Sequence, residues 1–591
     1  MTQAQKTSKT GESDGQDYRS KIFDLLDKYE GGREIFRNAY DWDQEVKLKP
    51  EYADDPSLPS SERDGDMAWL NLIDKVIGII AHDKYELDTY ENSIEIIDAD
   101  QMLEAYTKAG MPIMYDHWSF GKQRVLLDRA YEGGQMGLAY EIIINTAPAI
   151  AYCMEQNSKT MQALVIAHAS YGHNSFFKGN HLFQQFTKAD EIIPDMRRLR
   201  DKIRKAEDKY GYERVEKLID ACHALESHSV DKYTKPKPKT KEDRQEIRAK
   251  REEVRRRNYD EVIEDAGFPD KTSKKDFDAA NDDDLEAHKK AVHPSDREEN
   301  ILMYLVKNAP HLEPWEREIM ELMAVKAQYF YPQRQTQVMN EGWASFWHYT
   351  LMNELNDMDL IDESMMTEFL KSHTSVIYQP MTRKVQDPET GEIKEVPTFS
   401  QMNVYALGFA IFQDIKRICT EPTEEDKQWF PDIAGNGDWL GTIKDAMHAF
   451  KDESFILQYL SPKVIRDFRL FALSDHEENP MYNIDAIHDD EGYREVRQIL
   501  ASNYRLGEMV PQIFIDDYDF KGDRTLTLKF IPHNDKPLEE KDMNEVLKHI
   551  HQLWQHNVRL KVLDSDGDLD NILGCPPPEE HEFEALFTYD P

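Results

Sequence analysis

The sequence predicts an α+β protein with a predominantly helical main domain and a small C-terminal ferredoxin-like domain. Apolar residues recur at helical spacing through most of residues 18–478. From residue 479 to residue 571 the pattern changes to short strands and helices in the order βαββαβ, which is typical of a ferredoxin-like domain. A chain of 591 residues also exceeds what one hydrophobic core usually serves. We expect tails at 1–17 and 572–591, the first of them disordered.

Composition and charge exclude several classes of partner. Acidic residues outnumber basic ones by 113 to 73, and the resulting net charge of -40 repels nucleic acid and anionic lipid. The same charge is also compatible with a salt-adapted host. The four cysteines are scattered without a CxxC pair, which favours a reducing compartment. The cysteine pattern therefore predicts a cytoplasmic protein, and the charge predicts that it has no nucleic-acid partner. No apolar run is long enough to cross a bilayer, so we expect no membrane insertion.

Helical spacing dominates the main domain. Predicted helices cover residues 18–40, 67–82 and 99–109, with a short strand at 94–98. A strand-like segment at 140–146 is followed by Pro148, which opens a helical pattern that runs to His168. A further helix is predicted at 215–233, and helical sequence resumes at Ile301 and continues with breaks to about Leu473.

Residues 234–300 differ in composition from the rest of the main domain. They contain few aliphatic side chains and a dense mixture of acidic and basic ones. Such a segment cannot bury enough apolar surface to form a core of its own. We expect a solvated, partly helical insertion.

Glu341 and His348 lie in an aromatic helical stretch, MNEGWASFWH at residues 339–348. Residues seven apart on an α-helix lie within about 20° of each other on one face. The two side chains can therefore point at the same site. A buried carboxylate needs a partner or a metal ion, because an isolated charge in apolar surroundings is strongly unfavourable.

His168 and His173 lie in a second apolar helical stretch but are five residues apart. On an ideal α-helix this spacing separates them by about 140°, unlike the spacing of an HExxH motif. We expect Gly172 to end or kink the helix, so that His173 turns back toward the site. The residue after His168 is Ala169, so the general base of an HExxH enzyme is missing, and Glu341 or Glu226 would have to supply it.

A third helix carries His223 and Glu226, three residues apart and roughly on one side. Mixed histidine and carboxylate sets are typical ligands of zinc and other divalent first-row metals. The alternative is a set of core histidines that are hydrogen-bonded to backbone carbonyls. The segment YDHWSFGK at 115–122 has the composition of a loop that presents side chains, which makes His117 and Lys122 secondary candidates.

These observations give one hypothesis for the site. The predicted metal ligands are His168, His173, His223, Glu341 and His348. The predicted catalytic residues are Glu341, Glu226, Lys122 and His117. The hypothesis is a hydrolase or transferase acting on an amide or peptide bond with zinc, or alternatively manganese or iron, in which the metal lowers the pKa of a bound water.

Several stretches together resemble the SpoVR family, the stage V sporulation protein R group. They are IEIID at 94–98, GMP at 110–112, YDHWSFGK at 115–122, QALVIAHASYGHNSFFK at 162–178, MNEGWASFWH at 339–348 and DFRLF at 467–471. The resemblance covers roughly residues 67–564 and fits the Gram-negative, non-sporulating branch as well as the sporulating one.

The resemblance implies a cytoplasmic bacterial protein that is linked to spore-cortex peptidoglycan formation in spore formers and to stationary-phase or stress physiology elsewhere. It also implies two partners, an AAA-type serine protein kinase and a von Willebrand factor A-like protein. The family alone does not assign a molecular activity. A non-enzymatic adaptor of the kinase, or a protein with a purely structural metal, therefore stands beside the enzyme hypothesis.

Overall fold

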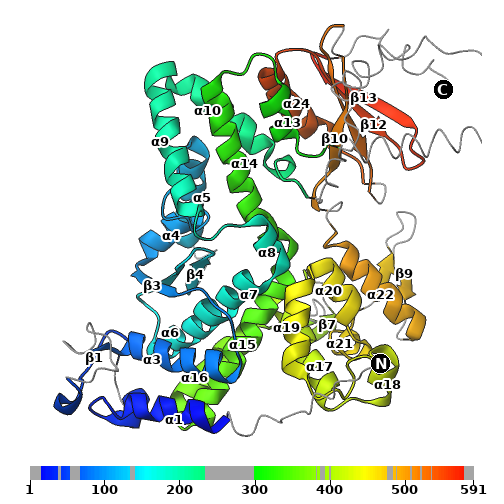
Figure 1. Ribbon diagram of the computed structural model, residues 1–591. Coiled ribbons are helices and arrows are strands. Elements are labelled where there is room, and N and C mark those ends of the chain that lie inside the picture. Colours follow the sequence, from blue (N-terminus) through cyan, green and yellow to red (C-terminus); the bar gives the residue numbers. More distant parts are fainter. Residues whose placement is uncertain are drawn as a thin grey trace, which may run out of the picture. The chain divides into compact units, whose positions relative to one another are not determined.

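The computed structural model describes most of the 591-residue chain (Figure 1). The described residues are 15–37, 41–53, 67–132, 140–232, 298–380, 382–386, 393–397, 401–470, 472–474, 483–486, 489–505, 509–519, 522–533 and 536–577. Most of the predicted N-terminal tail, nearly all of the charged insertion and residues 578–591 of the predicted C-terminal tail lie outside these ranges.

The structure confirms the α+β class, with helices predominating and a small C-terminal sheet. The chain divides into two compact units. The first unit contains residues 1–217 and 325–510, and the second contains residues 218–324 and 511–591. Among the helices that the structure describes, none combines the length and the apolar character needed to cross a bilayer.

The N-terminal part of the first unit is a series of helices around one small sheet. The α-helices are α1 (Gly15–Leu26), α3 (Trp69–Ile79), α4 (Ala99–Thr107), α5 (Trp118–Glu132), α6 (Lys159–Val165), α7 (Asn174–Gly179), α8 (His181–Phe186) and α9 (Ile192–Tyr210). Two segments are π-helices, η3 (Ile80–Lys84) and η4 (Ile166–His173), and two are 3₁₀-helices, η1 (Gly32–Phe36) and η2 (Pro50–Tyr52). Strands β1 (Glu45–Val46) and β2 (Met67–Ala68) form a short antiparallel pair.

The small sheet has the order β3-β5-β4 and corrects one prediction. Its strands are β3 (Asn92–Ile97), β4 (Glu141–Ile144) and β5 (Ala149–Met154). The helical pattern predicted from Pro148 to His168 is wrong over β5, which pairs in parallel with β3 and antiparallel with β4. All but one of the six β5 residues are buried, and a short, buried apolar run has no periodicity that separates a strand from a helix. The helix begins only after Ser158, whose side chain caps α6.

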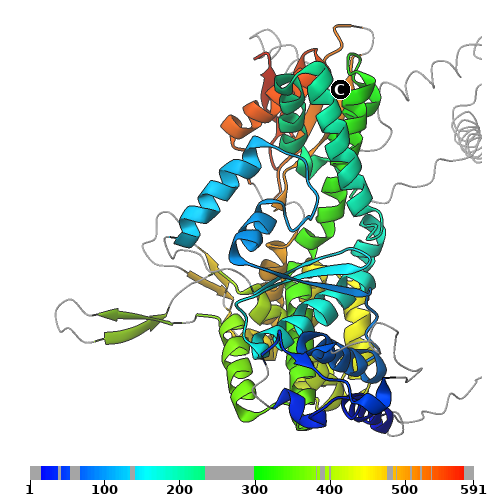
Figure 2. The ribbon, with the colours of Figure 1, turned by 90° about the vertical axis from the view of Figure 1, so that its left-hand side faces the viewer.

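The C-terminal part of the first unit is also helical. Its helices are α15 (Gln337–Asp357), α16 (Glu363–Val376), α17 (Val404–Thr420), α18 (Glu424–Trp429), α19 (Trp439–Ala449), α20 (Asp452–Tyr459), α21 (Pro462–Asp467) and α22 (Asp490–Ser502). Strands β6 (Thr382–Gln386) and β7 (Ile393–Pro397) form an antiparallel hairpin that extends from the helices in Figure 2.

Helix α15 lies at the centre of the core of this unit. It packs against α17 on one side and against η4 on another. Its aromatic side chains Trp343, Phe346 and Trp347 are completely buried. A Cβ atom on Gly342 would lie 2.3 Å from the carbonyl carbon of Gly408 in α17. The backbones of α15 and α17 are therefore in direct contact at this crossing, which only glycine permits.

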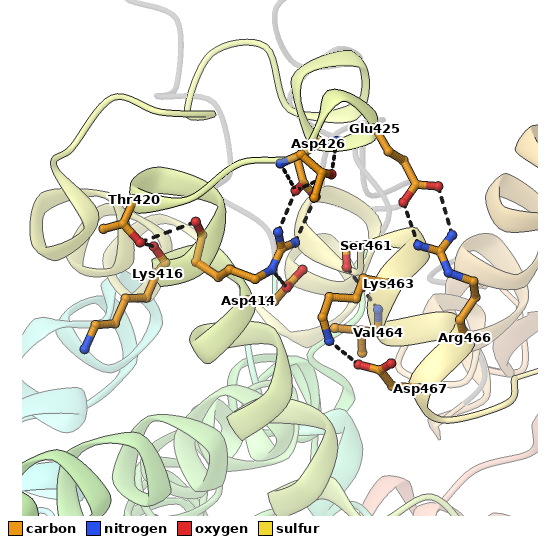
Figure 3. Close-up of polar contacts among 12 residues, drawn as sticks. Asp414, Lys416, Thr420, Glu425, Asp426, Ser461, Lys463, Val464, Arg466 and Asp467 are labelled. Carbon is orange, nitrogen blue, oxygen red and sulfur yellow. Dashed lines mark hydrogen bonds and ion pairs between the residues drawn. The ribbon is translucent and has the colours of Figure 1, made fainter.

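A polar network stabilises the connection between α17 and α18 (Figure 3). Arg417 donates to both carboxylate oxygens of Asp426, at 2.6 and 2.9 Å, and to Asp414 at 2.7 Å. Asp426 also accepts from the backbone and hydroxyl of Thr423, which completes a capping box at the start of α18. These bonds lower the pKa of the buried Asp426 carboxyl to about 2, although burial alone would raise it.

The second unit contains a four-stranded sheet with the order β10-β11-β12-β13. Its strands are β10 (Gln512–Tyr518), β11 (Leu526–Ile531), β12 (Val558–Leu563) and β13 (Leu569–Cys575), and helix α24 (Glu540–Trp554) connects the parallel pair β11 and β12. The unit also contains η5 (Glu226–His228) and α13 (Ile301–Asn308). Helices α10 (Tyr212–Ala224) and α14 (Pro314–Gln335) are each divided between the two units.

The C-terminal domain is present, but its order of elements differs from the predicted βαββαβ of a ferredoxin-like domain. The predicted first strand, β9 (Asn483–Ala486), pairs with β8 (Ala472–Ser474) in the first unit. The predicted first helix, α22, docks on α20, where the Arg497 guanidinium donates to the carbonyls of Leu457 and Leu460. The fourth strand is instead β13, which continues to Cys575, past the predicted domain end at residue 571. The observed order is therefore ββαββ.

Candidate metal centre

The π-helix η4 brings His168 and His173 onto one face. A π-helix closes its hydrogen bonds between residues i and i+5, so residues five apart lie one turn apart. The centroids of the two rings are 4.6 Å apart. The predicted end or kink at Gly172 is therefore wrong, because the helix runs through Gly172 and continues into α7. Gly172 serves a different purpose: a Cβ atom there would lie 2.6 Å from the Cα atom of Ala344, so glycine allows η4 to contact α15.

Glu341 of α15 completes a three-residue cluster. Its Oε2 atom lies 3.5 Å from His173 Nε2 and 3.9 Å from His168 Nε2. Among the described residues, the candidate ligand atoms of His168, His173 and Glu341 all lie within 4.8 Å of one another. The side chains of His168, His173 and Glu341 are 5%, 9% and 18% exposed.

The cluster fits a divalent metal ion in its chemistry and its spacing. Two histidines and one glutamate are the protein ligands of one class of catalytic zinc site. In a tetrahedral zinc site, bonds of about 2.0–2.1 Å place neighbouring donor atoms about 3.3 Å apart, close to the distances observed here. Glu341 Oε2 is buried and has no hydrogen-bond partner among the residues that the structure describes. A cation between the three side chains would satisfy this orphaned carboxylate oxygen.

Hydrogen bonds to the other ring nitrogens orient the two imidazoles. His173 Nδ1 lies 2.9 Å from the Oδ1 atom of Asn340, and His168 Nδ1 lies 2.8 Å from the Nδ1 atom of His348. Both rings therefore direct Nε2 toward Glu341. Metal-bound histidines usually hydrogen-bond through their second nitrogen in this way, which fixes the tautomer and the orientation of the ring.

Burial favours the neutral form of the His168 imidazole and makes the carboxylates of the site easier to protonate. The pKa of His168 is well below 6.5, because the ring is desolvated and lies close to His173 and His348. Burial also raises the pKa of Glu341, while His173 and a hydrogen bond from Tyr405 oppose that rise. Neutral imidazole is the form that binds a metal ion, and a cation at the centre would favour the ionised carboxylate.

Two functional candidates at this site were not identified from the sequence. Glu141, the first residue of β4, places Oε1 3.8 Å from His168 Nε2, and burial together with Glu341 raises its pKa to about 8. Tyr405 of α17 hydrogen-bonds to Glu341, and its ring stacks on His168 at 6.4 Å. The only local signal for Glu141 was a single acid before three isoleucines, and Tyr405 had none.

His348 lies at the back of the cluster instead of among the three candidate ligands. Its Nδ1 atom contacts His168, and its Nε2 atom lies 2.7 Å from the Nδ1 atom of His373 on α16. Both ring nitrogens therefore contact other histidines. His348 and Glu341 both lie next to the His168 imidazole, but His348 lies at Nδ1 and Glu341 at Nε2.

The other four predicted positions are not part of the three-residue cluster. His223 and Glu226 belong to the second unit. In the first unit, His117 Nδ1 hydrogen-bonds to the Ser119 hydroxyl at 2.7 Å, and His117 Nε2 lies 3.5 Å from a carboxylate oxygen of Glu216. Lys122 is exposed on α5, with its ammonium group 5.9 Å from the centre of the Trp118 ring.

Comparison with known proteins identifies the family. Residues 64–509 match the family described as SpoVR like protein, and residues 511–565 match the SpoVR-like C-terminal domain. The chain belongs to the SpoVR family. The boundary between its two SpoVR domains coincides with the end of the first unit at residue 510, and the three-residue cluster lies in the larger domain.

One relative of this SpoVR protein comes from Escherichia coli (strain K12). It is described as "Uncharacterized protein YcgB", and it is 48% identical over 499 residues, which cover 83% of the present chain and 92% of the relative. No solved structure matches the chain. The SpoVR match therefore establishes kinship with a bacterial protein, while the chemistry has to be inferred from the residues of the site.

Proposed function

We propose that this SpoVR protein is a metal-dependent hydrolase or transferase that acts on an amide or peptide bond. The observation that supports the proposal is the cluster of His168, His173 and Glu341, with a buried carboxylate oxygen that lacks a hydrogen-bond partner among the described residues. Zinc is the preferred occupant because of the donor set, and manganese and iron are the alternatives. The ligands come from two directly packed helices, η4 and α15, so the site needs little rearrangement to bind an ion.

Each residue of the site has a role in this proposal. A divalent cation, when bound, would supply an activated water molecule and polarise the carbonyl of the scissile bond. His168 and His173 would hold it through Nε2, and Asn340 holds the His173 ring by accepting from its Nδ1–H. Glu141 approaches the same His168 nitrogen as Glu341 does, and it would receive the proton of the water. Tyr405 orients the Glu341 carboxylate.

The proposal extends to a biological setting. Peptidoglycan stems consist of amide and peptide bonds, so an activity of this class in the cytoplasm would act on wall precursors. This setting is compatible with spore-cortex formation in sporulating relatives and with stationary-phase or stress physiology in a branch that contains an Escherichia coli protein.

A second candidate function, adaptor of an AAA-type serine protein kinase and a von Willebrand factor A-like protein, is favoured by one surface. On α5 the side chains of Trp118, Val125 and Leu126 are 52%, 48% and 56% exposed. Exposed apolar side chains that together form a contiguous patch mark protein–protein contacts, and these three lie on one helix. The adaptor needs no metal, so the two functions make different predictions for the same variants.

The deciding experiment is elemental analysis of protein purified without an affinity tag. We expect close to one equivalent of zinc, manganese or iron, and loss of that metal in a His168→Ala, Glu341→Ala double variant. His448→Ala, which removes an exposed imidazole outside the cluster, is the control and should keep the metal. A wild-type protein that carries no metal and takes up none from added zinc would contradict the proposal.

A second measurement separates a catalytic metal from a structural one. The probe is a synthetic peptidoglycan stem peptide, and its cleavage is followed by mass spectrometry. The Glu141→Gln variant should retain the metal and melt at the same temperature as the wild type, but it should not cleave the peptide. If chelation lowers the melting temperature and no cleavage is observed in the metal-loaded wild type, the metal is structural and the hydrolase is refuted.

A further inference from the structure

Behind the cluster, three imidazoles from three different elements form a continuous hydrogen-bonded chain. His168 comes from η4, His348 from α15 and His373 from α16. The Nδ1 atoms of His168 and His348 are 2.8 Å apart, and His348 Nε2 lies 2.7 Å from His373 Nδ1. The three residues are 4%, 1% and 3% exposed.

We infer that His348 and His373 are positioning residues that hold His168 in the Nδ1–H tautomer, so that its Nε2 lone pair is presented to the metal ion. The inference deepens the proposed function and rests on its metal centre. It rests on two consecutive hydrogen bonds between ring nitrogens, because the direction of donation in one bond fixes the direction in the next.

Each link of the chain fixes the next. A neutral imidazole has one N–H donor and one acceptor nitrogen, so each ring in the chain can donate only once. If His168 binds the cation through Nε2, its proton is on Nδ1 and is donated to His348 Nδ1. The proton of His348 is then on Nε2 and is donated to His373 Nδ1.

The opposite direction of donation along the chain gives His168 Nε2–H no hydrogen-bond acceptor among the described residues. It would place a proton on His168 Nε2, facing carboxylate oxygens of Glu141 and Glu341 at 3.8 and 3.9 Å. These distances are too long for hydrogen bonds. That tautomer would also leave His168 without a lone pair for the cation. The metal-binding polarity is therefore the one that leaves the Nε2 lone pair of His168 available to the cation.

The surroundings of the chain strengthen its hydrogen bonds. The ring of Tyr349 lies 4.9 Å from that of His373, the ring of Phe409 lies at the same distance, and Phe369 lies 6.1 Å from His348. An apolar wall excludes competing water and makes hydrogen bonds electrostatically stronger.

The two ligand histidines thus differ in their support. His173 contacts a carboxamide, Asn340, which neighbours Glu341 in sequence. His168 contacts an imidazole that is itself held by a second imidazole. Position 348 is therefore expected to tolerate only side chains that place an acceptor at the Nδ1 position.

The first test compares His348→Phe with His348→Asn. Phenylalanine keeps the ring but removes both nitrogens, whereas the Oδ1 atom of asparagine takes the place of Nδ1 and can accept from His168. Zinc alone is the probe, its affinity is measured by competition with a chelator, and the melting temperature of the metal-free protein is recorded. We expect His348→Phe to lose about 10–100-fold in zinc affinity, and His348→Asn to recover most of it.

The outcomes separate a positioning role from a purely structural one. A structural role predicts lower melting temperatures in both variants and no difference between their zinc affinities. If His348→Phe folds and binds zinc as tightly as the wild type, the inference fails although the metal centre stands. If the wild type binds no zinc, the proposed function fails first.

The second test reads the tautomers directly in the wild-type protein, so it does not depend on any variant folding. Nitrogen-15 spectra of histidine-labelled protein distinguish Nδ1–H from Nε2–H. We expect Nδ1–H on His168 and Nε2–H on His348 and His373, with or without zinc. A proton on His168 Nε2 in the zinc-loaded protein would overturn the inference.

Discussion

Replacing Gly342 by alanine tests the packing that holds Glu341 in place. The new Cβ atom would lie 2.3 and 2.4 Å from the carbonyl carbon and Cα atom of Gly408. Carbon atoms in contact are normally about 3.5–4.0 Å apart, so α15 and α17 would have to separate by about 1 Å at this crossing. The clashing atoms are backbone, so no side-chain rotation relieves the contact. Overpacking of this kind typically costs about 1–3 kcal/mol.

Helix α15 cannot move freely away from α17, because its other side is also in close contact. There, Gly172 of η4 already lies against Ala344. A displacement of α15 would therefore disturb the positions of Glu341 and His168 together. We expect Gly342→Ala to lower the urea midpoint of unfolding and to weaken zinc binding.

Gly121→Ala is the matched control for this prediction. Gly121 lies within α5, and a Cβ atom there would meet nothing within 4 Å among the described residues. Because alanine is the better helix former by about 0.5–1 kcal/mol, this variant should be slightly stabilised and should keep its zinc affinity. Equal stability of Gly342→Ala and the wild type, or an equal loss in both variants, would refute the packing argument.

Three further predictions follow from individual contacts. Asp426→Asn should destabilise the protein by on the order of 2 kcal/mol at pH 7. Because the pKa of Asp426 is lowered to about 2, the stabilisation by its carboxylate is present above about pH 4 and disappears as the pH falls toward 2. The urea midpoints of the wild type and the variant should therefore converge near pH 2. Asn340→Ala should reduce the zinc affinity, measured by chelator competition, by about 10–100-fold. Asn340→Asp keeps an acceptor for His173 and should bind zinc about as tightly as the wild type. Arg497→Leu should raise hydrogen exchange in α22 but leave strands β10 to β13 unchanged, and faster exchange in those strands would show that α22 supports the C-terminal sheet after all.

The elements that sequence periodicity predicted best are those with one buried and one exposed face. Strand β11 alternates buried and partly exposed residues along its length, and it corresponds to the third strand of the predicted βαββαβ pattern. The seven-residue spacing of Glu341 and His348 predicted that both side chains can point at one site. In the structure both lie next to His168, Glu341 at Nε2 and His348 at Nδ1.

The errors concern features that periodicity cannot encode. Strand β5 is buried except at Ile150, so its apolar run resembled the helical pattern that follows it. Residues 483–502 have the right elements for a ferredoxin-like domain, but contacts such as those of Arg497 assign them to the first unit. Glu141 and Tyr405 reach the site only through tertiary packing, because they are 27 and 237 residues away from His168 in the sequence.

The π-helix explains why the histidine spacing was misleading. π-Helical turns are rare and occur frequently at functional sites. In η4 the Tyr171 hydroxyl lies 2.8 Å from the backbone carbonyl and 2.9 Å from the carboxylate of Asp74, which ties η4 to α3. A regular α-helix over the same residues would direct His173 about 140° away from His168. The tertiary contacts of Tyr171 and Gly172 therefore stabilise the one helical geometry in which both imidazoles and Glu341 can bind the same ion.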